Sequence, residues 1–183
     1  VKVYPGSVEA WLEIICRDHY HGKWSDMKAD LQKALTSVDP KLRFVLLEGL
    51  YQHIRKINSS EDQEFIEKKC ARVIVETMKN FGQDLILSYY CSVFLKESGQ
   101  ADQAREWLEK ALVMDQEFWP ARLEILDLTR HEQILTESFK TQLVFFTTKA
   151  RMVKRFICSV CGLKRERIFF LCPRCFSWHS ISF

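Results

Sequence analysis

The sequence has little glycine and little proline, with six and four residues respectively among 183. All-β sandwiches and glycine-rich nucleotide-binding folds need more of both residues at their turns, so these classes are disfavoured. No window of about 18 consecutive apolar residues occurs, which excludes a membrane-spanning helix from this sequence. The start lacks both the apolar stretch of a secretory signal and an initiator Met. We interpret the missing Met as a sign that the sequence is a piece of a longer chain.

A disulfide framework is also missing. The seven cysteines are an odd number, and Cys16, Cys70 and Cys91 are isolated from the rest. This usage fits a reducing, intracellular compartment. The 47% of hydrophobic residues can fill a core, which excludes an intrinsically disordered chain.

The charge is unevenly distributed along the chain. Residues 1–148 have 19 Lys and Arg against 23 Asp and Glu, whereas residues 149–183 have eight Lys and Arg and a single acidic residue, Glu166. The last four cysteines lie in the same basic tail. The two changes together predict a helical domain over residues 1–153 and a separate small domain over residues 154–183.

Residues 1–153 show the apolar periodicity of amphipathic helices, with short breaks between them. Ser7 and Ser59-Ser60 are typical helix-start residues, and Gly22, Gly82 and Gly99 stand where turns are needed. Eight helices are predicted, near residues 8–20, 24–37, 41–57, 61–80, 84–97, 101–115, 119–130 and 132–153.

An internal repeat favours a solenoid over a closed bundle. Gly22, Leu31 and Ala34 recur 77 residues later as Gly99, Leu108 and Ala111. This spacing of large and small residues resembles the tetratricopeptide repeat, whose period is about 34 residues. We therefore expect an all-α solenoid of about four helix pairs that ends in a small β knuckle.

A solenoid of this kind exposes a concave surface to protein partners. The inner-helix positions predicted to line it are His19, Tyr20, Tyr89, Val93 and Lys96. The alternative is that Tyr20 and Tyr89 are half-buried packing residues. Cys16, His19 and His21 offer metal-ligand types near one helix end, but no fourth member accompanies them, so we interpret them as a packed thiol with solvated histidines.

The strongest chemical signal is the pair of motifs Cys158-Ser-Val-Cys161 and Cys172-Pro-Arg-Cys175. Two residues between thiols allow both sulfurs of one turn to bind the same ion, at about 2.3 Å for zinc. The ten-residue link suits a hairpin, with Ile168–Leu171 as its returning strand. Four thiolates form a closed tetrahedral site, which disfavours metal hydrolysis; His179 is not needed as a ligand. We predict one structural zinc ion, although iron also fits four sulfurs.

The tail closely resembles the C-terminal rubredoxin-like knuckle of the lipopolysaccharide assembly protein B family. The shared features are the ten-residue link, Pro173 after the third thiol, Trp178 three residues after the fourth, and the preceding basic segment 149–155. The sequence departs from the pattern in having about four repeat pairs where the family has about nine. It also has Phe176 where a rubredoxin has glycine.

The resemblance implies tetratricopeptide repeats and a metal knuckle at the cytoplasmic face of the bacterial inner membrane. The family is held there by an N-terminal helix, which this sequence lacks. The family restrains lipopolysaccharide synthesis by promoting turnover of the lipid A deacetylase by a membrane protease. In that family the knuckle packs on the repeats, and Phe169, Phe170 and Trp178 are the residues expected to dock here.

We therefore expect a non-enzymatic adaptor. Two alternatives remain open: a nucleic-acid-binding zinc ribbon and an iron-containing redox module. The first would use a basic region with aromatic residues available for stacking, although nucleic acid is the less favoured partner. No phosphate-binding glycine loop or Gly-x-Ser-x-Gly motif supports an enzyme. The basic residues are Lys149, Arg151, Lys154, Arg155, Lys164, Arg165, Arg167 and Arg174.

Overall fold

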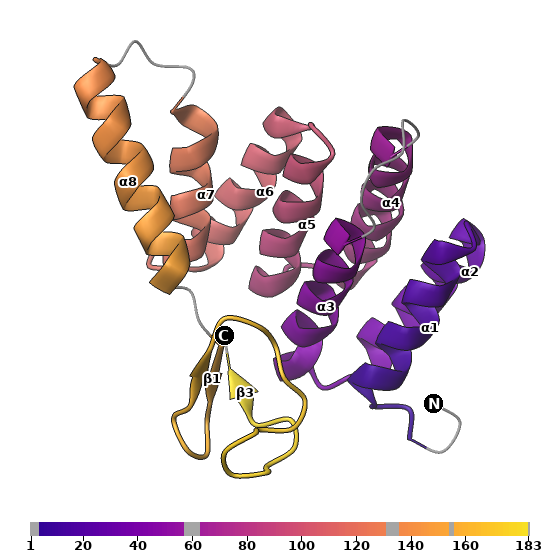
Figure 1. Ribbon diagram of the computed structural model, residues 1–183. Coiled ribbons are helices and arrows are strands. Elements are labelled where there is room, and N and C mark those ends of the chain that lie inside the picture. Colours follow the sequence, from indigo (N-terminus) through magenta and orange to yellow (C-terminus); the bar gives the residue numbers. More distant parts are fainter. Residues whose placement is uncertain (1–3, 57–62, 131–135, 154–155, 183) are drawn as a thin grey trace. The chain divides into compact units, whose positions relative to one another are not determined.

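The computed structural model describes residues 4–56, 63–130, 136–153 and 156–182, which are mostly helical and end in short strands (Figure 1). The helices are α1 (Val8–Tyr20), α2 (Trp24–Ser37), α3 (Arg43–Lys56), α4 (Gln63–Met78), α5 (Leu85–Glu97), α6 (Ala101–Met114), α7 (Trp119–Thr129) and α8 (Glu137–Val153). The predicted all-α fold is confirmed. Ser59-Ser60 and the predicted helix starts at 61 and 132 lie outside the described residues.

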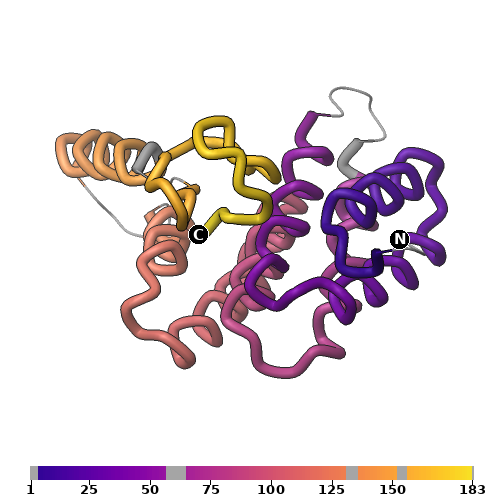
Figure 2. The backbone as a smooth tube through the Cα atoms, turned by 90° about the horizontal axis from the view of Figure 1, so that it is seen from below, coloured from indigo at the N-terminus to yellow at the C-terminus, as the bar shows by residue number. Residues whose placement is uncertain are grey.

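Packing divides the chain into two compact units, residues 1–107 and 108–183. In the first unit, α1 packs on α2 and α3, α2 packs on α4, and α5 packs on both α3 and α4 (Figures 1 and 2). The contacts of α1 with α3, α2 with α4 and α3 with α5 each join a helix to the next but one along the chain, as in a solenoid of stacked helix pairs.

The turns after α1 and α5 confirm the 77-residue repeat. In the first turn the amide of Gly22 donates to the carbonyl of His19 at 3.0 Å, and Gly99 donates to Lys96 at the same distance. The amides of the next residues, Lys23 and Gln100, each donate to the carbonyl five residues earlier, at 2.9 Å in both cases. Both glycines have positive φ, 66° and 76°, a backbone conformation that side chains disfavour.

A buried polar contact joins α3 to α5. The hydroxyl of Tyr90, fully buried on α5, donates a 2.8 Å hydrogen bond to Oε2 of Glu48 on α3. Nε2 of Gln52 donates to the other oxygen of Glu48 at 3.0 Å. Burial, followed by the charge of Glu48, raises the pKa of Tyr90 well above its usual value. The tyrosine therefore stays protonated and can donate.

We expect Tyr90→Phe to lower the free energy of unfolding by about 2 kcal/mol, because it removes a donor to a buried carboxylate. Urea denaturation followed by circular dichroism measures the change. The matched control is Tyr20→Phe, since Tyr20 is 74% exposed and its hydroxyl should contribute almost nothing. A loss for Tyr90→Phe no larger than the control's would contradict a stabilising role for the contact.

In the second unit an ion pair joins α8 to α7. One guanidinium nitrogen of Arg151 lies 2.7 Å from a carboxylate oxygen of Asp127 and 3.4 Å from one of Glu124. After α8, the strands β1 (Phe156–Cys158), β2 (Lys164–Arg165) and β3 (Ile181–Ser182) form an antiparallel sheet with β1 in the middle. In the described part of the chain, no helix combines the length and apolar character required to cross a bilayer.

Candidate metal centre

Two equivalent turns present the four clustered cysteines. In the first, the amide of Gly162 donates to the carbonyl of Cys158 at 2.8 Å; in the second, Phe176 donates to Cys172 at 2.9 Å. A second hydrogen bond, which spans five residues, closes each turn. The Cys158 amide donates to the carbonyl of Leu163, and the Cys172 amide donates to the carbonyl of Ser177. The chain thus repeats one backbone geometry 14 residues apart and points both pairs of sulfurs inward.

The sulfur atoms are spaced for a metal ion rather than for disulfides. Sγ of Cys158 lies 3.7 Å from Sγ of Cys175, and Sγ of Cys161 lies 3.6 Å from Sγ of Cys172. All four lie within 4.8 Å of one another. A disulfide requires about 2.05 Å, whereas a tetrahedral ion with 2.3 Å bonds places its sulfurs about 3.8 Å apart. The predicted ligand cluster is therefore assembled, and it can hold a metal ion.

Two serine hydroxyls that the sequence analysis did not single out lie against the sulfurs. Oγ of Ser180 is 3.2 Å from Sγ of Cys158, and Oγ of Ser177 is 3.3 Å from Sγ of Cys175. Hydrogen bonding to Ser180 lowers the pKa of Cys158 to about 6, and hydrogen bonding to Ser177 lowers the pKa of Cys175. The pKa of Cys161 is instead raised to about 12: the backbone of Leu163 lowers it, but burial and hydrogen bonds to the other thiols outweigh that contribution. Thiolates are the species that bind metal, so these hydroxyls favour the binding form.

Phe176 occupies a position that suits glycine. Its φ is 56°, close to the 70° of Gly162 at the equivalent place in the first turn. The left-handed conformation costs a residue with a β-carbon about 1–2 kcal/mol. The ring is 71% exposed, so little packing offsets that cost. The departure from the rubredoxin pattern therefore leaves the turn geometry intact but places backbone strain in the second turn.

We expect Phe176→Gly to be more stable than Phe176→Ala by about 1 kcal/mol. Both substitutions remove the ring, and only alanine retains the left-handed strain. Competition with a chelator measures how tightly each variant holds its metal, and glycine should resist better. Equal resistance would show that the second turn carries no strain.

One predicted strand is wrong. Ile168–Leu171 does not form the returning strand of the hairpin; in this stretch only Leu171 makes a β-bridge, to Trp178. The reason is that β1 pairs on its two sides with β2, which follows the first turn directly, and with β3 at the end of the chain. Residues 168–171 instead lead into the second turn.

The five residues predicted to line a partner surface differ in exposure. Tyr20 is exposed, whereas Val93 and Lys96 are half-buried. His19 and Tyr89 are buried, at 5% and 2% exposure. Buried side chains offer a partner little area, so only Tyr20, Val93 and Lys96 have appreciable exposed area, and the partner surface itself stays a prediction. The alternative that both tyrosines are half-buried packing residues is wrong for Tyr20, and Tyr89 packs more deeply than that alternative expected.

The knuckle keeps large apolar side chains at its surface. Trp178 is 63% exposed, and Phe169 and Phe170 are half-buried. Their docking on the helices stays a prediction. The predicted boundary at 153/154 coincides with the change from helix to strand, whereas the division by packing falls earlier, between Trp107 and Leu108.

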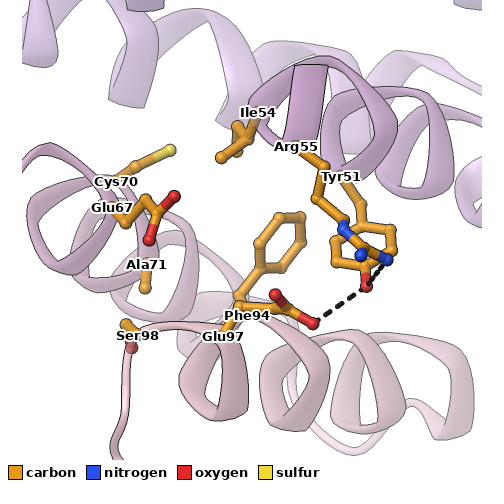
Figure 3. Close-up of a pocket in the computed structure, with 9 residues that line it drawn as sticks. All are labelled: Tyr51, Ile54, Arg55, Glu67, Cys70, Ala71, Phe94, Glu97 and Ser98. Atoms are coloured by element: carbon orange, nitrogen blue, oxygen red, sulfur yellow. Dashed lines mark hydrogen bonds between the residues drawn. The ribbon is translucent and has the colours of Figure 1, made fainter. Parts of the chain in front are cut away.

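A small cavity of the first unit lies among α3, α4 and α5 (Figure 3). At ≈ 20 Å³ it has room for water but not for a cofactor. Arg55 donates to the hydroxyl of Tyr51 at 3.1 Å, and that hydroxyl donates to Glu97 at 3.0 Å. These contacts tie the ends of α3 and α5 together. The lining residues are Tyr51, Ile54, Arg55, Glu67, Cys70, Ala71, Phe94, Glu97 and Ser98.

Comparison with protein-family models finds no match to the chain, and comparison with curated protein sequences finds none either.

Proposed function

We propose that the protein is a non-enzymatic adaptor that binds other proteins through its helical repeats and is completed by a knuckle with one structural zinc ion. The observation that carries the proposal is the four-cysteine cluster, whose sulfurs have tetrahedral spacing, in a chain that also has a solenoid-like stack of helices. A closed four-sulfur shell leaves an ion no open position for water or substrate, which suits a structural role.

Zinc is the ion proposed because it prefers tetrahedral thiolate sites and has no redox chemistry of its own. Iron fits the same sulfurs and would support the redox alternative. Elemental analysis of the purified protein, together with its visible spectrum, distinguishes the two. One equivalent of zinc and no colour supports the adaptor, whereas iron with visible absorption would replace it with an electron-transfer role.

The partners follow from the resemblance of the tail to the lipopolysaccharide assembly protein B family. We propose that the chain acts at the cytoplasmic face of the bacterial inner membrane and promotes turnover of the lipid A deacetylase by a membrane protease. The fold supports such a role in a general way, because stacked helix pairs provide extended surfaces for protein partners.

Binding tests the partner assignment directly. Calorimetry should detect association of the full chain with purified lipid A deacetylase or with the soluble part of the protease. Tyr20→Ala should weaken it, whereas Tyr4→Ala is the matched control, since Tyr4 is also exposed, at 62%, but lies before α1. If neither protein binds at tens of micromolar and the deacetylase is degraded at an unchanged rate, the partner assignment is wrong.

A further inference from the structure

Two histidine rings from different helices meet inside the first unit. His19 lies near the end of α1, and His53 lies in the last turns of α3. Their ring centroids are 5.6 Å apart and the rings are nearly perpendicular, at 79°. The ring centroid of Trp24 lies 5.7 Å from that of His19. Tertiary packing therefore pairs two imidazoles that are 34 positions apart in the sequence.

The ring nitrogens of this pair are buried without hydrogen-bond partners among the described residues. This holds for both Nδ1 and Nε2 of His19 and for Nε2 of His53. The His19 residue is 95% buried, since its exposure is 5%. Leaving a buried polar group unpaired costs about 1–3 kcal/mol, so three such nitrogens in one place point to a ligand that the imidazoles share.

The protonation state suits metal binding. Burial, with a further contribution from His53, lowers the pKa of His19 to about 4. Burial and the charge of Lys56 lower the pKa of His53, although Glu13 opposes the shift. Both rings are therefore neutral at pH 7, and neutral imidazole is the form that binds metal ions.

Cys16 is a further donor on the same stretch of α1, although burial raises the pKa of its thiol to about 12. Cys16 precedes His19 by three residues on α1, so the two side chains occupy the same face of the helix. The charge of Glu13 acts on both Cys16 and His53, which places this stretch of α1 beside the end of α3.

The histidine that the sequence pattern grouped with Cys16 and His19, namely His21, is exposed. Contrary to the solvated state expected from the sequence, His19 is buried.

We propose that His19 and His53 bind one transition-metal ion of the zinc class, a second metal site separate from the four-cysteine knuckle. The knuckle is the one group of three or more candidate ligands in the described part of the chain whose donor atoms already lie within 4.8 Å. The histidine site therefore starts with two ligands, and water, or Cys16 after it loses its proton, must complete it. It binds more weakly than the knuckle and fills after it.

Cobalt titration of the full chain tests the proposal. The protein is first loaded with one equivalent of zinc, which fills the tighter four-cysteine site, and Co²⁺ is then added. We expect a second equivalent to bind, with the visible bands of imidazole-bound cobalt and at most the charge-transfer absorption of a single thiolate. His53→Gln and His19→Gln should each abolish this second equivalent while retaining the zinc of the knuckle.

His21→Gln is the matched control, because it removes an exposed histidine from the same end of α1 and should keep the second equivalent. Circular dichroism establishes that each variant is folded. His53→Gln is the safer variant, since that side chain is only half-buried. The proposal is overturned if the wild-type chain stops at one equivalent, or if His53→Gln binds the second as the wild type does.

Discussion

Cys172→Ser is expected to unfold the C-terminal knuckle and leave the helices folded. The thiol of Cys172 is fully buried and is one of the four possible ligands. A segment with three strands of two or three residues each buries too little apolar surface to fold alone. A structural zinc ion supplies about 10–16 kcal/mol to such a domain, and three thiolates retain only part of that.

Amide hydrogen exchange measures the effect, because the amides of Cys158 and Cys172 donate the bonds that close the two turns. These amides should lose protection in Cys172→Ser and after chelation, while amides of α5 stay protected. Cys91→Ala is the matched control: it removes a buried thiol of α5 and should leave the metal in place. Protection of the knuckle after metal removal would show that it folds without an ion.

The first unit is expected to lose stability as the pH falls from about 6.5 toward 4. The folded protein holds His19 neutral, with a pKa of about 4, whereas an unfolded chain protonates it near pH 6.5. Between these values the unfolded state binds the extra proton, so acid favours unfolding. The free energy of unfolding falls by about 3 kcal/mol once the pH is below both pKa values of His19. The lowered pKa of His53 acts in the same direction.

Urea denaturation at pH 7.5 and pH 5, with one equivalent of zinc present, measures the loss. His19→Gln should reduce the difference between the free energies of unfolding at the two pH values, because glutamine does not titrate. His21→Gln should leave the difference as in the wild type, since His21 is exposed. If His19→Gln keeps the full pH dependence, then the stability lost in acid comes from other groups.

Helix positions were predictable from the sequence because their signals are local. Apolar periodicity located α1 and α2 at their observed bounds, and the Oγ of Ser7 accepts the capping bond from Ala10 at 3.2 Å. The 77-residue repeat predicted two turns whose hydrogen bonds match. The interval between two cysteines is equally local, which is why the four candidate ligands of the knuckle could be identified from their spacing.

Other features depend on long-range packing. The sequence predicted a strand at 168–171. Strand pairing depends on which segments lie beside β1, and in the fold these are β2 and β3. The sequence showed Phe176 at a position where a rubredoxin has glycine, but only the structure shows that Phe176 adopts the left-handed φ of 56° there. The hydroxyls of Ser177 and Ser180 became relevant only when the turns placed them within 3.3 Å of the sulfurs.

By itself, then, the sequence determined the helical class, the repeat register and the four candidate metal ligands, since each follows from spacings that can be read along the chain. The tertiary structure decided which side chains are buried and which distant ones meet. It buried Tyr89, left Tyr20 exposed, and replaced the expected neighbour of His19 with His53 from another helix. Burial and long-range contact depend on how helices stack, and no spacing within one helix encodes that.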